Sequence, residues 1–136
     1  MSASKAEIIE FMKTNFPQSQ CVVEEIIANG AIVSHDIGFN QLRPGGTVAG
    51  PVLMAIADVA IYVAILGKIG IVSLAVTTSF NINFLRKPVA NSRIIAHCNL
   101  IKTGKTLIIG EVSLYSEANN DLVAHAVATY AIPKEP

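Results

Sequence analysis

The stretch VLMAIADVAIYVAILG, residues 52–67, decides the fold of this chain. It holds two ionisable groups, one carboxylate and one phenol, and its other residues are apolar. Gly50-Pro51 predicts that a helix starts here, because the fixed φ and missing N–H of proline suit the first helical turn. Gly67 and Gly70 predict where it ends. A long helix that is apolar on every side is typical of a buried central element.

The carboxylate in this helix is Asp58. Burying an ionised carboxylate without partners is costly in free energy, so a chain keeps such a group for a reason. One hypothesis is structural: Asp58 caps another element or pairs with a buried arginine. The other is functional: Asp58 is a catalytic base in a cleft, since perturbed carboxylates often mark sites. The helix alone leaves both hypotheses open.

Composition limits the possible classes of protein. At 136 residues, the chain predicts a single domain, 1–136, with one core. Hydrophobic residues make up 51% of it and charged residues 15%, so we expect a homo-oligomer, a dimer or a dimer of dimers, in which another copy covers part of this surface. The formal net charge is zero, which argues against nucleic acid or an anionic membrane as a partner.

The sequence has no clear targeting or cofactor signal. The apolar run 52–66 has about 15 residues against the ~20 of a bilayer span, and the N-terminal residues lack the apolar region of a signal peptide, so we expect a cytoplasmic protein. Cys21 and Cys98 lie in different segments with no cysteine or histidine at ligand spacing, which predicts neither a disulfide framework nor a metal site. The sequence has no dinucleotide loop, and no cofactor is expected.

Strands are expected both before and after the central helix in the sequence. Ser4 to Glu7 forms a capping box before a short amphipathic helix that Pro17 closes. Asn29-Gly30 predicts a two-residue hairpin turn, and residues 38–49 predict a loop rich in Gly and Pro. The expected strands are 21–28, 31–37, 73–84, 93–102, 106–117 and 122–132.

The strand 73–84 alternates cleanly between an apolar face and a polar face, and Thr77 falls on the polar one, opposite Phe80. An antiparallel sheet must cover its apolar face, and the helix at 52–66 is the element hydrophobic enough to do so. We therefore predict an α+β fold in which a curved antiparallel sheet wraps around one long central helix.

That layout is the hotdog fold, and the sequence RPGGTVAGPVLMAIADVA, residues 43–60, resembles the signature of the PaaI-like acyl-CoA thioesterases. In this family a G-x-x-H-G-G loop opens the central helix, and an Asp or Glu follows two turns later. TTSFNINFLRKP, the Thr-Gly-Lys turn and LVAHAVATYAI resemble the later strands of the family. The chain has Ala49 where the family has the loop histidine.

The resemblance implies three catalytic roles. Asp58 matches the carboxylate that acts as general base or nucleophile. Gly50 matches the glycine whose N–H polarises the thioester carbonyl, a role that suits the partial positive charge of a helix N-terminus. Thr77 matches a Ser or Thr that positions water, although a threonine on the polar face of a strand is also simply a good β-former.

Other residues are candidates for binding the substrate. Arg86, Lys87 and Lys105 fall at strand ends and could hold the phosphates of coenzyme A, or could be ordinary solvated charges. Arg43 could be a further donor or an exposed loop residue. Tyr62, one turn after Asp58, could line an acyl pocket or bond within the core.

We therefore expect an acyl-CoA or acyl-carrier thioester hydrolase with sites between subunits and no metal. A hotdog hydratase is a less suitable alternative, because such an enzyme pairs a histidine with the carboxylate and Ala49 occupies that place. The alternative from another class is a non-catalytic dimer that binds acyl chains or coenzyme A.

Overall fold

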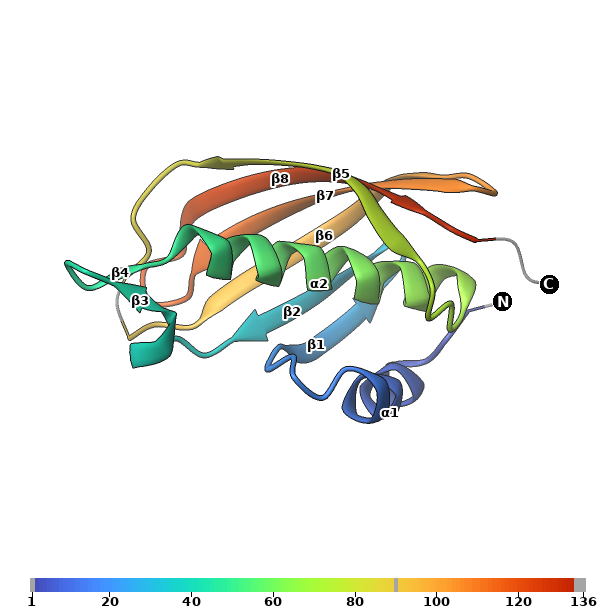
Figure 1. Cartoon of the computed structure of the whole chain (residues 1–136), viewed down its shortest axis with the longest axis horizontal. Coiled ribbons are helices and arrows are strands. Elements are labelled where there is room, and N and C mark those ends of the chain that lie inside the picture. The colour runs from blue at the N-terminus through green and yellow to red at the C-terminus, as the bar shows by residue number, and fades with distance from the viewer. Residues whose placement is uncertain (1, 90, 134–136) are drawn as a thin grey trace.

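The computed structural model describes residues 2–89 and 91–133 (Figure 1). Of the expected domain 1–136, residues 1, 90 and 134–136 therefore lie outside the described part. The long helix α2, Gly50–Ile69, lies against one face of a six-stranded antiparallel sheet. The sheet has the strand order β1-β2-β6-β7-β8-β5, so β5 is an edge strand beside β8. The predicted α+β hotdog arrangement is confirmed.

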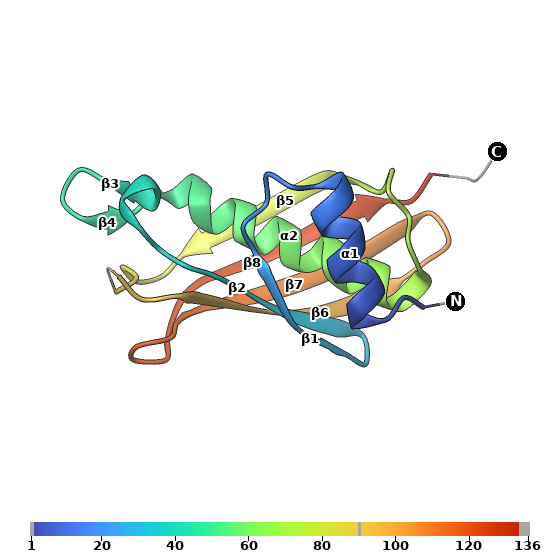
Figure 2. The ribbon, with the colours of Figure 1, turned by 90° about the horizontal axis from the view of Figure 1, so that it is seen from below.

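The six strands are close to the predicted ones, with ends that differ by up to three residues: β1 Val22–Ile27, β2 Gly30–His35, β5 Val76–Phe84, β6 Ile94–Thr103, β7 Leu107–Ser116 and β8 Asp121–Ala131. The helix α1, Lys5–Asn15, has the predicted capping box between Ser4 and Glu7 and packs beside α2 (Figure 2). The segment predicted as a loop contains a 3-10 helix, Phe39–Gln41, and a small hairpin of β3, Leu42–Arg43, and β4, Thr47–Val48.

The first hairpin differs from the prediction by one residue. Its turn is Ala28-Asn29, because Ile27 pairs with Gly30 and Asn29 has a φ of 57°. Gly30 belongs to the strand, where a Cβ would lie 2.2 Å from the carbonyl oxygen of Cys98. Glycine is therefore needed for the close approach of β2 to β6 rather than for the turn.

The central helix is longer than predicted. Gly67 does not end it, and it continues to a C-cap at Gly70, whose φ is 99°. By length and apolar composition this 20-residue helix could cross a bilayer, so the expectation that it is too short to do so is wrong. Of its most apolar window, 56% is buried within the fold. Its buried side packs on β2, β6, β7 and β8 and forms the core.

One stripe of α2 is not covered by the sheet. Met54 is 40% exposed, and Asp58 and Tyr62 are half-buried along the same stripe, whereas Ala57 and Ile61 are fully buried. The expectation that Asp58 lies inside the core is therefore corrected. It lies at the edge of the core, because residues three and four apart share one side of a helix and this side faces the edge strand β5 and α1.

Candidate functional site

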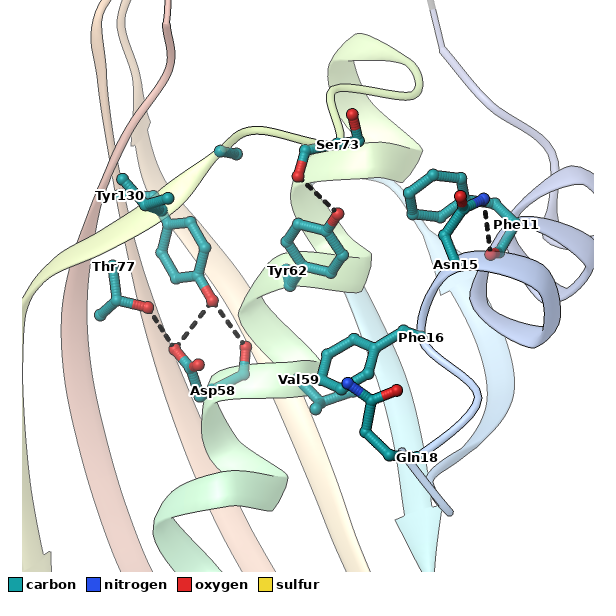
Figure 3. Close-up of a pocket in the computed structure, with 12 residues that line it drawn as sticks. Phe11, Asn15, Phe16, Gln18, Asp58, Val59, Tyr62, Ser73, Thr77 and Tyr130 are labelled. Carbon is teal, nitrogen blue, oxygen red and sulfur yellow. Dashed lines mark hydrogen bonds between the residues drawn. The ribbon is translucent and has the colours of Figure 1, made fainter.

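Asp58 lines a cavity of about 610 Å³ between α2, α1 and the start of β5 (Figure 3). The wall opposite the carboxylate is aromatic and comes from Phe11 and Phe16 at the end of α1. Asp58 is the one carboxylate among its lining residues. The rest of the lining mixes apolar and polar side chains. A concave cavity with aromatic walls and a few directed polar groups is a usual form of a small-molecule site.

Two hydroxyl groups hold the Asp58 carboxylate. Thr77 donates from Oγ1 to Oδ1 over 2.8 Å, and the Tyr130 hydroxyl also lies 2.8 Å from Oδ1 (Figure 3). The Tyr130 hydroxyl is 3.2 Å from the main-chain oxygen of Asp58 as well. Within the described residues, no hydrogen bond to Oδ2 is recorded. The carboxylate thus has one tethered oxygen and one open oxygen.

A β-bulge brings Thr77 to this position. Thr77 pairs with Tyr130 across the β5–β8 ladder, and the register shifts between Thr77 and Ser79. The extra residue places Thr77 on the same side of the sheet as Phe80, which lines a smaller cavity with Asp58 and Thr77. The prediction that Thr77 lies on the polar face, opposite Phe80, was wrong, because alternation cannot anticipate a bulge.

Sequence reasoning did not identify Tyr130. The available signal is the alternation on β8, where Ala126, Ala128 and Tyr130 all point toward α2 and are buried. A phenol on such a face needs a hydrogen-bond partner. Burial raises the pKa of Tyr130, and the negative charge of Asp58 raises it further, so the hydroxyl stays protonated.

Tyr62 lines the same cavity as Asp58, a position compatible with the hypothesis that it lines an acyl pocket. Its hydroxyl donates to the main-chain oxygen of Ser73 over 3.2 Å. Its ring lies between those of Phe11 and Tyr130, with centroid distances of 6.4 and 6.3 Å. Burial raises the pKa of the Tyr62 phenol. The three rings join α1, α2 and β8 next to the carboxylate.

A second candidate site lies at the start of α2. Pro51 has no N–H, and the N–H groups of Val52 and Leu53 both bond to the carbonyl of Ala49. Ala49 is the N-cap and provides no side-chain hydrogen bond. Within the described residues, no acceptor is recorded for the Gly50 N–H. This group is therefore available for an anionic or polarised oxygen.

Three of the predicted cations gather around this helix start. Arg43, Arg86 and Lys87 line a cavity of about 480 Å³ together with Gly50 and Phe84. Lys105 lies elsewhere, in the turn between β6 and β7, which Figure 1 draws at the other end of the sheet. The structure thus brings together three of the four cations that the sequence suggested, and separates Lys105 from them.

The two sites are separate within one chain. Gly50 and Asp58 are eight residues apart on one helix, which corresponds to a rise of about 12 Å along its axis. They line different cavities. A single carbonyl group cannot contact both groups of one protomer at hydrogen-bond distance.

The remaining candidates for reactive groups are metal ligands and the two cysteines. The described part of the chain contains no cluster of three or more His, Cys, Asp or Glu residues that could hold a metal ion. Both cysteines are free. Burial raises the pKa of Cys21 to about 11 and that of Cys98 to about 12, which disfavours the reactive thiolate at neutral pH.

Comparison with known proteins identifies the family. The profile of the thioesterase superfamily matches residues 45–123, more than half of the chain. A proposed thioesterase from Silicibacter sp. TM1040 is 33% identical, with 96% of this chain and 92% of that chain covered and a TM-score of 0.88. Among curated protein sequences, no match is found.

Two further structures share the fold at lower identity. Zebrafish thioesterase superfamily member 2 is 19% identical, with 97% of this chain and 100% of that chain covered and a TM-score of 0.84. The PaaI protein of the E. coli phenylacetic acid degradation operon is 17% identical, with coverages of 95% and 93% and a TM-score of 0.83. The chain therefore belongs to the thioesterase superfamily and has the hotdog fold.

Proposed function

We propose that the protein hydrolyses acyl-CoA or acyl-carrier thioesters, with Asp58 as the catalytic carboxylate. The observation that carries this proposal is the position of Asp58: one carboxylate, held by two hydroxyl groups, at the edge of an aromatic-lined cavity. Membership of the thioesterase superfamily supports the reaction class. The cavity would take the acyl chain, and the carboxylate would act at the thioester carbon.

In the proposed reaction, Asp58 takes a proton from a water molecule, and the resulting hydroxide adds to the thioester carbon. The carbonyl oxygen becomes negatively charged and accepts a hydrogen bond from the Gly50 N–H, at the positive end of the α2 dipole. Collapse of this intermediate breaks the C–S bond and expels a thiolate, which takes up the proton from Asp58 and so restores the carboxylate. Direct attack by Asp58, through an acyl anhydride, is the second route open to a carboxylate in this position.

The separation of Gly50 and Asp58 supports sites shared between two copies of the chain. The Gly50 of one copy would meet the Asp58 of the other, since the two groups of one copy are about 12 Å apart along the helix. The side of the fold that contains Asp58 is also apolar and open. Val76 and Phe84 on the edge strand are more than half exposed, and Met54 is 40% exposed. Pairing of two copies would cover these side chains.

Arg43, Arg86 and Lys87 would bind the phosphate groups of coenzyme A, because they line one cavity with the Gly50 N–H. A carrier protein offers a single phosphodiester at the corresponding place. The cluster of three cations therefore favours coenzyme A as the thiol component.

The test is release of free thiol from a panel of acyl-CoA esters by the wild-type protein and by Asp58→Asn. We expect hydrolysis by the wild type and a fall in kcat of about a hundredfold or more in Asp58→Asn. Asp36→Asn is the matched control, because Asp36 is exposed and away from the cavity. Equal rates for Asp58→Asn and the wild type would exclude Asp58 from the mechanism.

A non-catalytic protein that binds coenzyme A or acyl chains is the second candidate. The apolar Ala49 at the N-cap favours it, because the helix start lacks a polar side chain that could orient a thioester. Binding of coenzyme A without turnover of any thioester in the panel would decide for this candidate.

A further inference from the structure

The Asp58 carboxylate is held in an unequal way. Both hydrogen bonds from side chains reach Oδ1, and both come from one ladder pair, Thr77 and Tyr130. A hydroxyl group has a single proton to donate, so each of these two protons is used on Asp58. A carboxylate whose one oxygen accepts two donors cannot rotate without breaking both bonds.

The geometry points to Tyr130 as a positioning residue that, together with Thr77, fixes Oδ1 of Asp58 so that Oδ2 is the oxygen that acts on water or on the thioester. This inference rests on the proposed function and adds a residue to it. The hydroxyl group of Tyr130 would touch neither the reacting carbonyl group nor the water and would act through Asp58.

Tyr130 is suited to this role because its own position is fixed. Its side chain is 3% exposed and packs on the Tyr62 ring, which in turn packs on Phe11 of α1. A buried side chain in such contacts has few alternative rotamers. The hydroxyl therefore stays directed at Asp58.

The groups around Asp58 include hydroxyl donors but no cation. The titratable groups that line the cavity besides Asp58 are the phenols of Tyr62 on α2 and Tyr130 on β8, while α1 and the following turn contribute Phe11, Asn15, Phe16 and Gln18, which carry no charge. No salt bridge to Asp58 is recorded in the described part of the chain. The carboxylate is therefore held in place by hydroxyl groups instead of by a salt bridge.

The same contacts refine the role of Thr77. Because its proton is used on Asp58, Thr77 can hold a water molecule only as an acceptor, through the lone pairs of Oγ1. A water that donates one proton to Thr77 and the other to Oδ2 would be positioned by both residues.

The first test compares kcat and KM of Tyr130→Phe with those of the wild type. We expect kcat to fall about ten- to hundredfold, the range for one hydrogen bond to a charged group, with KM nearly unchanged. A role in folding alone would lower the melting temperature and leave the kcat of the folded protein unchanged.

Tyr115→Phe is the matched control, since Tyr115 is half-buried on the opposite face of the sheet. Thr77→Val should repeat the loss seen in Tyr130→Phe, and Thr77→Ser, which keeps the hydroxyl group, should recover most of the activity. A Tyr130→Phe enzyme with the wild-type kcat would overturn the inference.

A second test does not depend on activity. NMR scalar couplings that report the χ1 angle of Asp58 should show one rotamer in the wild type and averaging among rotamers in the double variant Thr77→Val/Tyr130→Phe. If the couplings are the same in both proteins, Asp58 is fixed by something else and the inference fails. If the wild type hydrolyses no thioester but the couplings change, the proposed function fails while the positioning of Asp58 by Tyr130 stands.

Discussion

Gly50 and Asp58 lie on one helix, eight residues apart, and line two different cavities. The N–H of Gly50 has no recorded acceptor in the described part of the chain, and the Oδ2 of Asp58 has no recorded donor there. Each cavity thus presents half of what thioester hydrolysis needs: a donor for the developing oxyanion, or a base for water.

The first prediction concerns the space at Gly50. A Cβ at this position would lie 3.3 Å from the ring of Phe84 and would narrow the approach to the N–H. We expect kcat to fall about tenfold in Gly50→Ala and further in Gly50→Val, with melting temperatures close to that of the wild type, because the half-exposed Phe84 ring can move. Gly38→Ala, away from both cavities, is the control. Full activity in Gly50→Val would contradict the role of this N–H.

The second prediction concerns the cation cluster. The double variant Arg86→Ala/Lys87→Ala should raise KM for acyl-CoA about tenfold or more and leave kcat nearly unchanged, because uniform binding to distant phosphates is lost. Thioesters of N-acetylcysteamine, which have no phosphate, should be hydrolysed equally by the variant and the wild type. Lys102→Ala controls for the loss of exposed positive charge. An equal rise in KM with both kinds of substrate would show that these residues do not act by binding the phosphates of coenzyme A.

The third prediction concerns stability at acidic pH. A hydrogen bond from Arg93, over 2.6 Å, lowers the pKa of Glu117 from its ordinary value of 4.5. The contribution of this pair to stability is therefore complete above the pKa of the unfolded state and is lost as the pH falls through the lower pKa of the folded state. Between pH 5 and pH 3, thermal melts of Glu117→Gln should depend less on pH than those of the wild type.

The effect should be small, because Glu117 is exposed. Glu25→Gln, at an exposed position with no recorded ion pair in the described residues, should follow the wild-type curve. Identical pH dependence in Glu117→Gln and the wild type would show that the pair contributes nothing.

The fourth prediction concerns Gly30. Because a Cβ there would meet the main chain of β6 at 2.2 Å, the Gly30→Ala protein must separate two paired strands. We expect a loss of about 2 kcal/mol or more in the free energy of unfolding, measured by denaturant titration. In Gly38→Ala the nearest atom is 3.4 Å away, at the end of a flexible side chain, and the loss should be much smaller. A stable Gly30→Ala protein would contradict this register.

The sequence predicted the central helix, the six strands and the family, because these depend on hydrophobic periodicity and on short local signals. It did not predict the bulge beside Thr77. That bulge depends on how β5 pairs with β8, which lies far later in the chain, and no local pattern encodes it. Tyr130 was missed for a similar reason, because it lies 72 residues from Asp58 in sequence and the two meet only in the folded structure.

The helix start shows the same limit. The sequence predicted that Gly50 lies at the start of α2, and it suggested three cations that line one cavity with Gly50. It could not show that Lys105 lies apart from them, because strand ends near in sequence can lie at opposite ends of a sheet. Nor could it show that Gly50 and Asp58 belong to different cavities.

The most direct test of the shared site is complementation between two inactive variants, Asp58→Asn and Gly50→Val. In a heterodimer purified through two different tags, one site would combine Asp58 from one copy with Gly50 from the other, and the second site would lack both. If the site is shared between two copies, each parent variant should be nearly inactive and the heterodimer should regain about half of the wild-type thiol release. A heterodimer as inactive as its parents would contradict a shared site.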